Sequence, residues 1–105
     1  MLQIGNKRNP PVTEFDVQMY DEMQAINVRG IIFCMQAVMK IMEKQTPITT
    51  TCRSGRVREL GRGAIVNMSS ALGLIAIPGN LQYVVAKHAV LGATKTAGES
   101  NDLPE

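Results

Sequence analysis

The sequence predicts an α/β fold, as a helix–strand–helix portion of a doubly wound parallel sheet. A long segment carries apolar residues at helical spacing, a short β-prone run follows it, and a second helical segment comes after a loop. With 45% hydrophobic and 19% charged residues, the 105 positions have the composition of one globular domain. Because one strand cannot satisfy its own backbone hydrogen bonds, we expect residues 1–105 to be a single but partial domain.

The first predicted helix covers residues 15–44. Its apolar positions follow one another at spacings of three or four: Met19, Met23, Ile26, Gly30, Phe33, Ala37 and Ile41. Further apolar residues widen this stripe, which predicts a helix packed on more than one side. Asn27 lies inside the apolar stretch, where an amide is costly unless it is hydrogen-bonded. It either satisfies backbone groups at a helix bend, or holds a water or a catalytic side chain.

Residues 45–62 are predicted to be a surface loop, because Pro47, a run of threonines and Ser54-Gly55 break the periodicity. Four arginines make the loop basic, but it has no aromatic side chain on which a base could stack. A solvated loop is therefore favoured over a nucleic-acid-binding loop. The net charge of +2 likewise predicts neither nucleic acid nor an anionic membrane as a partner.

The next predicted elements are one strand and one helix. Residues 64–68 (AIVNM) are short, apolar and β-prone, which fits one buried strand of a parallel sheet. A loop containing Gly73, Pro78 and Gly79 follows. Asn80 is the predicted N-cap of a helix over residues 81–97, and Gly98 is its predicted stop.

Tyr83 and Lys87 lie four positions apart on this second helix, and therefore on one face. An ammonium near a phenol stabilises the phenolate, so such a tyrosine can exchange protons with a carbonyl or alcohol oxygen. The same spacing also arises by chance in surface pairs.

Ser69 and Ser70 follow the predicted strand directly. In open α/β sheets, ligands bind beyond the carboxyl ends of the strands, where a hydroxyl can bond a substrate oxygen. Alternatively, both serines cap the strand end or start a turn.

Taken together, these motifs resemble the short-chain dehydrogenase/reductase family. They are Asn27 in INVRG, the serines of GAIVNMSSALGL, and YVVAK, in which Tyr83 stands 13 positions after Ser70. The resemblance runs from about residue 4 to 96 and implies a Rossmann-like domain that binds NAD or NADP. In members of this family the residues before the strand can form an extended insert, which residues 45–62 would be.

The resemblance also implies a role for each matching residue. Tyr83 corresponds to the general acid/base, and Lys87 to the lysine that makes this phenol more acidic and binds the nicotinamide ribose. Ser70 corresponds to the serine that polarises the substrate oxygen, and Asn27 to the asparagine that holds a relay water. The implied reaction is hydride transfer between NAD(P)(H) and a small carbonyl or secondary alcohol, with Tyr83 and Lys87 contacting the cofactor.

The sequence departs from the family in one respect that concerns activity. It contains no glycine-rich strand–turn–helix fingerprint, so the first βαβ half and its pyrophosphate site are absent. We therefore expect the 105-residue chain to be inactive alone, with its substrate and its choice of NAD or NADP unspecified. The alternative is a non-enzymatic truncated remnant or a fragment that depends on a partner.

Several expectations concern partners and location. The start of the chain has no apolar signal region and no apolar run reaches the roughly 20 residues of a membrane span, so we expect a cytoplasmic protein without a membrane partner. Cys34 and Cys52 are isolated, so no metal site is expected, and Cys34 should lie in the core. His88 is expected to be a packing or surface residue. In the family, helices of this kind pack against a second subunit, which implies a homo-oligomer for the full-length form.

Overall fold

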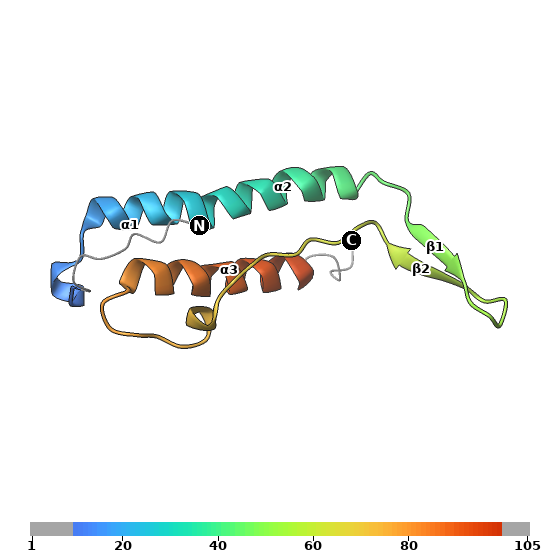
Figure 1. The fold of residues 1–105 in the computed structure, drawn as a ribbon. Helices are drawn as coiled ribbons and strands as arrows, with labels where there is room; N and C mark the ends of the chain where they lie inside the picture. The colour runs from blue at the N-terminus through green and yellow to red at the C-terminus, as the bar shows by residue number, and fades with distance from the viewer. Residues whose placement is uncertain (1–9, 100–105) are drawn as a thin grey trace. The chain divides into compact units, whose positions relative to one another are not determined.

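The structure is a computed structural model that describes residues 10–99 (Figure 1). The described residues fall into two compact units. The first comprises residues 10–32 and 67–99, and the second comprises Phe33–Val66. The candidate catalytic residues all belong to the first unit.

The first predicted helix is confirmed, with one irregular turn inside it. After a short 3₁₀ turn at Val12–Glu14, α1 covers Val17–Gln24 and α2 covers Gly30–Met42. Helix α1 begins at residue 17 because Asp16 caps it, its carboxylate accepting a bond from the Met19 amide at 3.1 Å.

Between α1 and α2, residues Ala25–Arg29 form a π-helical turn that contains Asn27. The Gly30 amide donates to the Ala25 carbonyl, five residues earlier, instead of closing an ordinary α-turn. Asn27 therefore does lie at a local distortion of the helix, as one of the two sequence interpretations held.

The expectation that this helix packs on more than one side is not met within the described residues. Only Met23 and Met35 are buried on it, whereas Ile26, Phe33 and Ile41 are more than half exposed. Cys34, expected in the core, is also exposed. Within residues 10–99, Val17–Met42 is the one helical run long and apolar enough to cross a membrane, a criterion that core helices of soluble proteins also meet.

The predicted strand over residues 64–68 is not observed, and the parallel sheet of the predicted fold is not confirmed. The sheet within the described residues is two-stranded and antiparallel. A strand requires neighbours for its backbone groups, and residues 64–68 have none there. Their side chains still alternate as a strand's would, since Ile65 and Asn67 are half-buried while Val66 and Met68 are 90% and 76% exposed.

The segment 45–62, predicted to be a loop, instead forms a β-hairpin (Figure 1). Strand β1 covers Ile48–Thr51 and pairs antiparallel with β2, Val57–Gly61, with an irregularity after Ile48. The Gly55 amide bonds back to the Cys52 carbonyl, and Gly55 has a φ of 80°, which closes the turn. The residues of both strands are mostly exposed, and their regular pairing was not predicted.

A 3₁₀ turn at Ala71–Gly73 precedes α3, which covers Leu81–Glu99. The Asn80 carbonyl accepts the first helical bond, from Val84, as expected of an N-cap position. The predicted stop at Gly98 is wrong, because the helix continues through it to Glu99. The core of this unit joins Met23 of α1 to Tyr83 and Ala86 of α3.

Candidate active site

Tyr83 and Lys87 are both buried on α3, with 9% and 5% of their surface exposed. They share the packed face of the helix with Ala86 and Val90, a stripe that follows from helical periodicity. The Lys87 Nζ lies 5.6 Å from the centroid of the Tyr83 ring. The structure therefore brings the predicted pair together in an apolar setting, where a charge interacts more strongly than in water.

The Lys87 ammonium has hydrogen-bonding capacity to spare. Its Nζ donates to the Met68 carbonyl at 3.4 Å, and this is its one hydrogen bond among residues 10–99. An ammonium has three protons, so two can still be donated to a ligand.

A second contact ties Lys87 to the segment before α3, here called the serine segment (residues 67–73). The Ser69 hydroxyl donates to the Lys87 carbonyl at 3.0 Å, while the Lys87 ammonium reaches back to Met68. This reciprocal contact holds the serine segment against the turn of α3 that carries Lys87.

Asn67, at the start of the serine segment, is bound to a more distant turn of α3. Its Nδ2 donates to the Thr94 hydroxyl at 3.0 Å, and that hydroxyl donates to the Val90 carbonyl at 2.7 Å. Thr94 and Lys87 are two turns apart on the same face of α3, so the serine segment is bound to this face at two positions along the helix.

Gly73 allows the closest approach between the serine segment and α3. A Cβ atom at this position would lie 2.9 Å from the Lys87 carbonyl oxygen and 2.5 Å from the Ser69 hydroxyl. Any larger residue would push the segment away from the helix.

Ser70 makes a different contact from Ser69. Its hydroxyl oxygen accepts a bond from the Leu72 amide at 3.3 Å and caps the 3₁₀ turn, as the structural interpretation of the serines proposed. Leu72 in turn packs against the cluster that contains Tyr83.

Asn27 is connected to Tyr83 indirectly, by way of the side chain of Met23. Its Nδ2 lies 3.0 Å from the Met23 sulfur, and Met23 packs against Tyr83. Within residues 10–99, the hydrogen bonds of Asn27 and Ser70 thus run to Met23 and Leu72, not to Tyr83 or Lys87.

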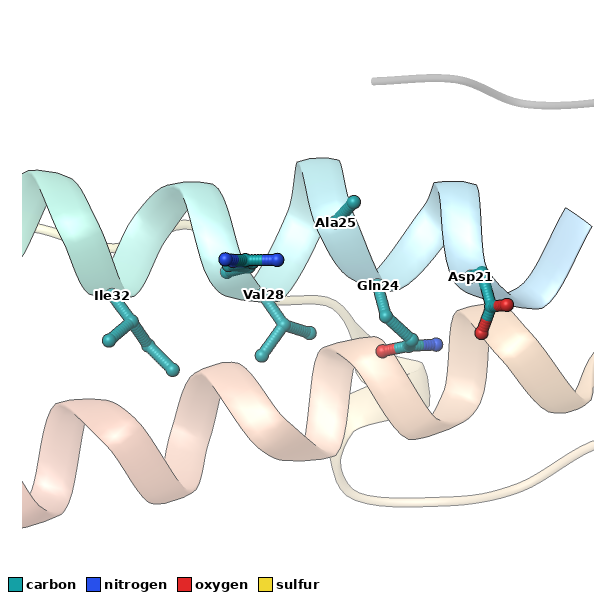
Figure 2. A pocket seen from close by; sticks show the side chains of 6 residues that line it. Asp21, Gln24, Ala25, Val28 and Ile32 are labelled. Carbon is teal, nitrogen blue, oxygen red and sulfur yellow. The ribbon is translucent and has the colours of Figure 1, made fainter. Parts of the chain in front are cut away.

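A groove of about 500 Å³ lies beside the π-turn (Figure 2). It is lined by Asp21, Gln24, Ala25, Val28, Arg29 and Ile32. Gln24, Val28 and Ile32 project from one side of the helix toward α3, and the Gln24 amide donates to the Gln82 carbonyl at 2.8 Å (Figure 2). None of the four predicted catalytic residues lines this groove.

The sequence did not predict that Asn67, Thr94 and Gly73 hold the serine segment, nor that Ser69 binds the Lys87 carbonyl. The polar Asn67 inside an apolar run is the one local signal that could have indicated an anchor. His88 is exposed, and its ring bonds the Val84 carbonyl at 2.9 Å, which fits the expected surface role.

The profile of the short chain dehydrogenase family matches residues 3–101. Short-chain dehydrogenase anuF of Penicillium roqueforti is 37% identical over 94 residues, which are 90% of this chain and 34% of that protein. Short-chain dehydrogenase srdC of Neurospora crassa is 38% identical over 100 residues, or 95% of this chain and 35% of that protein. The 2,5-dichloro-2,5-cyclohexadiene-1,4-diol dehydrogenase of Sphingobium indicum is 32% identical over 88 residues, or 83% and 29%.

The chain spans about a third of the length of these relatives. No solved structure gives a significant match. The family match nevertheless covers almost the whole sequence and includes the helix that carries Tyr83 and Lys87. The chain belongs to the short-chain dehydrogenase family.

Proposed function

We propose that Tyr83, Lys87, Ser70 and Asn27 belong to an active site that transfers hydride between NAD(P)(H) and a small carbonyl or secondary alcohol. The observation that carries this proposal is the buried Lys87 ammonium beside the Tyr83 ring. The relatives are named dehydrogenases, which supports the reaction class. Since the chain spans about a third of them, the proposal concerns the activity of the whole protein.

Tyr83 is the proposed proton donor and acceptor. Its phenol hydroxyl gives a proton to the substrate oxygen during carbonyl reduction and takes it back during alcohol oxidation. The Lys87 ammonium, held by burial and by the Met68 carbonyl, favours the charge that this exchange leaves on the phenol.

Ser70 and Asn27 have proposed supporting roles. The Ser70 oxygen already accepts a bond from Leu72, which fixes the hydroxyl while its own proton can be donated to a substrate oxygen. The Asn27 Nδ2 is directed at Met23, so its amide oxygen can accept a bond from a relay water.

The residues present fit the nicotinamide-ribose end of NAD(P), because Lys87 has two protons available for ribose hydroxyls. When bound, the nicotinamide supplies or takes up the hydride. The 105 residues contain no glycine-rich phosphate loop, so the choice between NAD and NADP does not enter the proposal.

The test is a chimera in which this chain replaces the matching 88-residue region of the Sphingobium indicum dehydrogenase. Conversion of the substrate in that enzyme's name is followed through the nicotinamide absorbance. Removal of the Tyr83 hydroxyl (Tyr83→Phe) should lower kcat by about 100-fold or more, because proton transfer would lose its donor.

The matched control is Tyr20→Phe, which removes the hydroxyl of the only other tyrosine in the chain. It should leave kcat within about twofold, because Tyr20 lies on α1, where its ring contacts Phe15. Retention of activity by Tyr83→Phe in a chimera that is active with Tyr83 would contradict the proposed role.

A further inference from the structure

The hairpin β1–β2 has almost no buried surface of its own. All residues of β1 and the first four residues of β2 are exposed, with Ile48, Val57 and Leu60 about 60% exposed. A two-stranded hairpin is marginally stable in water and gains stability from a third strand. In the described residues each strand has one neighbour, so each has an outer edge with free backbone groups.

The charge of the hairpin segment is strongly one-sided. Residues 45–62 contain four arginines, Arg53, Arg56, Arg58 and Arg62, against one acidic residue, Glu59. Arg62 donates to the Gln45 carbonyl at 3.0 Å. Within residues 10–99, the side chains of the other three arginines make no hydrogen bond or ion pair. The segment therefore presents uncompensated positive charge to a partner.

The strand register places two of these arginines together. Thr50 pairs with Arg58, and the Cys52 amide donates to the Arg56 carbonyl. Arg56 directly precedes β2 and is paired with Cys52, and because side chains alternate along an extended chain, Arg56 and Arg58 lie on one face of the hairpin, about 7 Å apart. Val57 and Glu59 lie on the opposite face, so Glu59 does not neutralise the arginine pair.

We infer that the outer edge of β2 binds an extended acidic peptide segment as a third strand. Backbone bonds to the free edge supply the pairing, as in other cases of strand addition. Side chains directly opposite in neighbouring strands are about 5 Å apart, so acidic residues at alternate positions meet Arg56 and Arg58. The residue between them faces Val57, which favours a β-branched apolar side chain.

The same observations disfavour two other occupants. A second copy of the chain would bring four more arginines to the same surface, which like-charge repulsion opposes. A single-stranded nucleic acid would satisfy the charge, but residues 45–62 contain no aromatic side chain for base stacking. This inference does not depend on the proposed dehydrogenase activity.

The test uses fluorescein-labelled peptides and the chimera with the Sphingobium indicum dehydrogenase described above, with binding measured by fluorescence anisotropy. The first peptide alternates Glu with Val or Thr over ten positions, and the second has the same composition with all Glu in one block. The alternating peptide should bind about tenfold more tightly. N-methylation of alternate amides on the pairing edge should abolish binding, because it removes the backbone donors.

Variants of the chain separate the arginine pair from general charge. The double change Arg56→Gln/Arg58→Gln should weaken binding of the alternating peptide about tenfold. The control Lys44→Gln/Arg53→Gln removes the same charge from positions outside the strands and should change affinity less than twofold.

Three results would overturn the inference. They are equal affinity for the alternating and block peptides, binding that survives N-methylation, and an equal loss from both double variants. Tighter binding of a single-stranded oligonucleotide than of the alternating peptide would also overturn it and identify a nucleic-acid surface instead.

Discussion

Several contacts of the candidate site converge on Lys87. Its ammonium donates to the Met68 carbonyl, and its own carbonyl accepts a bond from Ser69. Gly73 packs closely against the same carbonyl. One helical residue thus both faces Tyr83 and holds the serine segment in place. Substitutions can separate these two roles.

Gly73→Ala should destabilise the first unit by about 1–3 kcal/mol, because the added methyl group would meet the Lys87 carbonyl at 2.9 Å. The carbonyl belongs to a helix backbone and cannot rotate away as a side chain could. Thermal denaturation of the chimera, followed by circular dichroism, measures the change.

The matched control is Gly92→Ala on α3, where a Cβ would meet nothing within 4 Å. This change should raise stability by about 0.5–1 kcal/mol, because alanine favours a helix interior over glycine. If both changes shifted the melting temperature equally, the close approach at Gly73 would not be important.

Lys87→Met should remove activity while leaving the melting temperature of the chimera within a few degrees or higher. Methionine fills a similar volume without a buried charge, and Met68, whose surface is 76% exposed, can pair its carbonyl with water. A large loss of stability together with activity would point to a structural role for this lysine. The paired measurement of kcat and melting temperature separates the two.

At the scale of single residues, the sequence predicted those features that follow from the geometry of an α-helix alone. Tyr83 and Lys87 share a face because they are four residues apart, whatever surrounds them. The division between Ser69, which binds the Lys87 carbonyl, and Ser70, which caps the 3₁₀ turn, depends on how the segment packs. Adjacent serines give no local signal of that packing.

Among the elements, α3 supports the whole candidate site. The residues that hold the serine segment lie along one side of it, at Lys87 and Thr94. The start of the segment depends on the hydroxyl of Thr94, which receives a bond from Asn67 and donates one to Val90.

Thr94→Val should loosen the start of the serine segment, because it removes both hydrogen bonds while preserving side-chain shape. The bond from Asn67 is worth about 1 kcal/mol, so amides near Asn67 should exchange with solvent about fivefold faster in the chimera. Mass-spectrometric hydrogen exchange measures this directly.

Thr96→Val on the same helix is the comparison, since the Thr96 hydroxyl donates to the Gly92 carbonyl in the same manner. It should leave exchange near Asn67 unchanged. Equal acceleration by both substitutions would argue against an anchoring role for Thr94.

The elements differ in how far their sequence determines them. The helices at residues 17–42 and 81–99 follow from their apolar spacing or capping, and both were predicted. Residues 64–68 have the alternation of a strand, but among residues 10–99 they have no neighbour to pair with, so their sequence alone could not make a strand. The hairpin was missed although the β-branched run at residues 48–51 and the Ser54-Gly55 turn both indicated it.

For the whole molecule, the main feature is how little apolar surface the described residues bury. Five hydrophobic residues are buried, whereas fifteen large ones are exposed, among them Val66, Leu74 and Met68. Such a surface associates with other apolar surface when it is available.

We therefore expect the purified 105-residue chain to associate with itself and to melt without a sharp transition. Light scattering after size exclusion should give a mass above the 11.4 kDa of one chain, rising with concentration. A monomer with a cooperative thermal transition would contradict this expectation.

A separate expectation concerns the cofactor. The 105-residue chain should show no saturable binding of NADH or NADPH at micromolar concentrations, because its sequence lacks a glycine-rich loop for the pyrophosphate. Titration with either nucleotide, followed by nicotinamide fluorescence, measures this. Micromolar affinity would show that the phosphates are held by other residues of the chain.

The π-turn at Ala25–Arg29 has a consequence for angular register. In a regular α-helix each residue turns by about 100°, so Met23 and Val28, five positions apart, would point about 140° away from one another. The wider turn absorbs one residue, which reduces the angle to about 40° and allows both side chains to reach the cluster around Tyr83. Deletion of one residue from this turn would therefore regularise the helix and still leave both side chains on the face toward α3, because they would then be four positions apart.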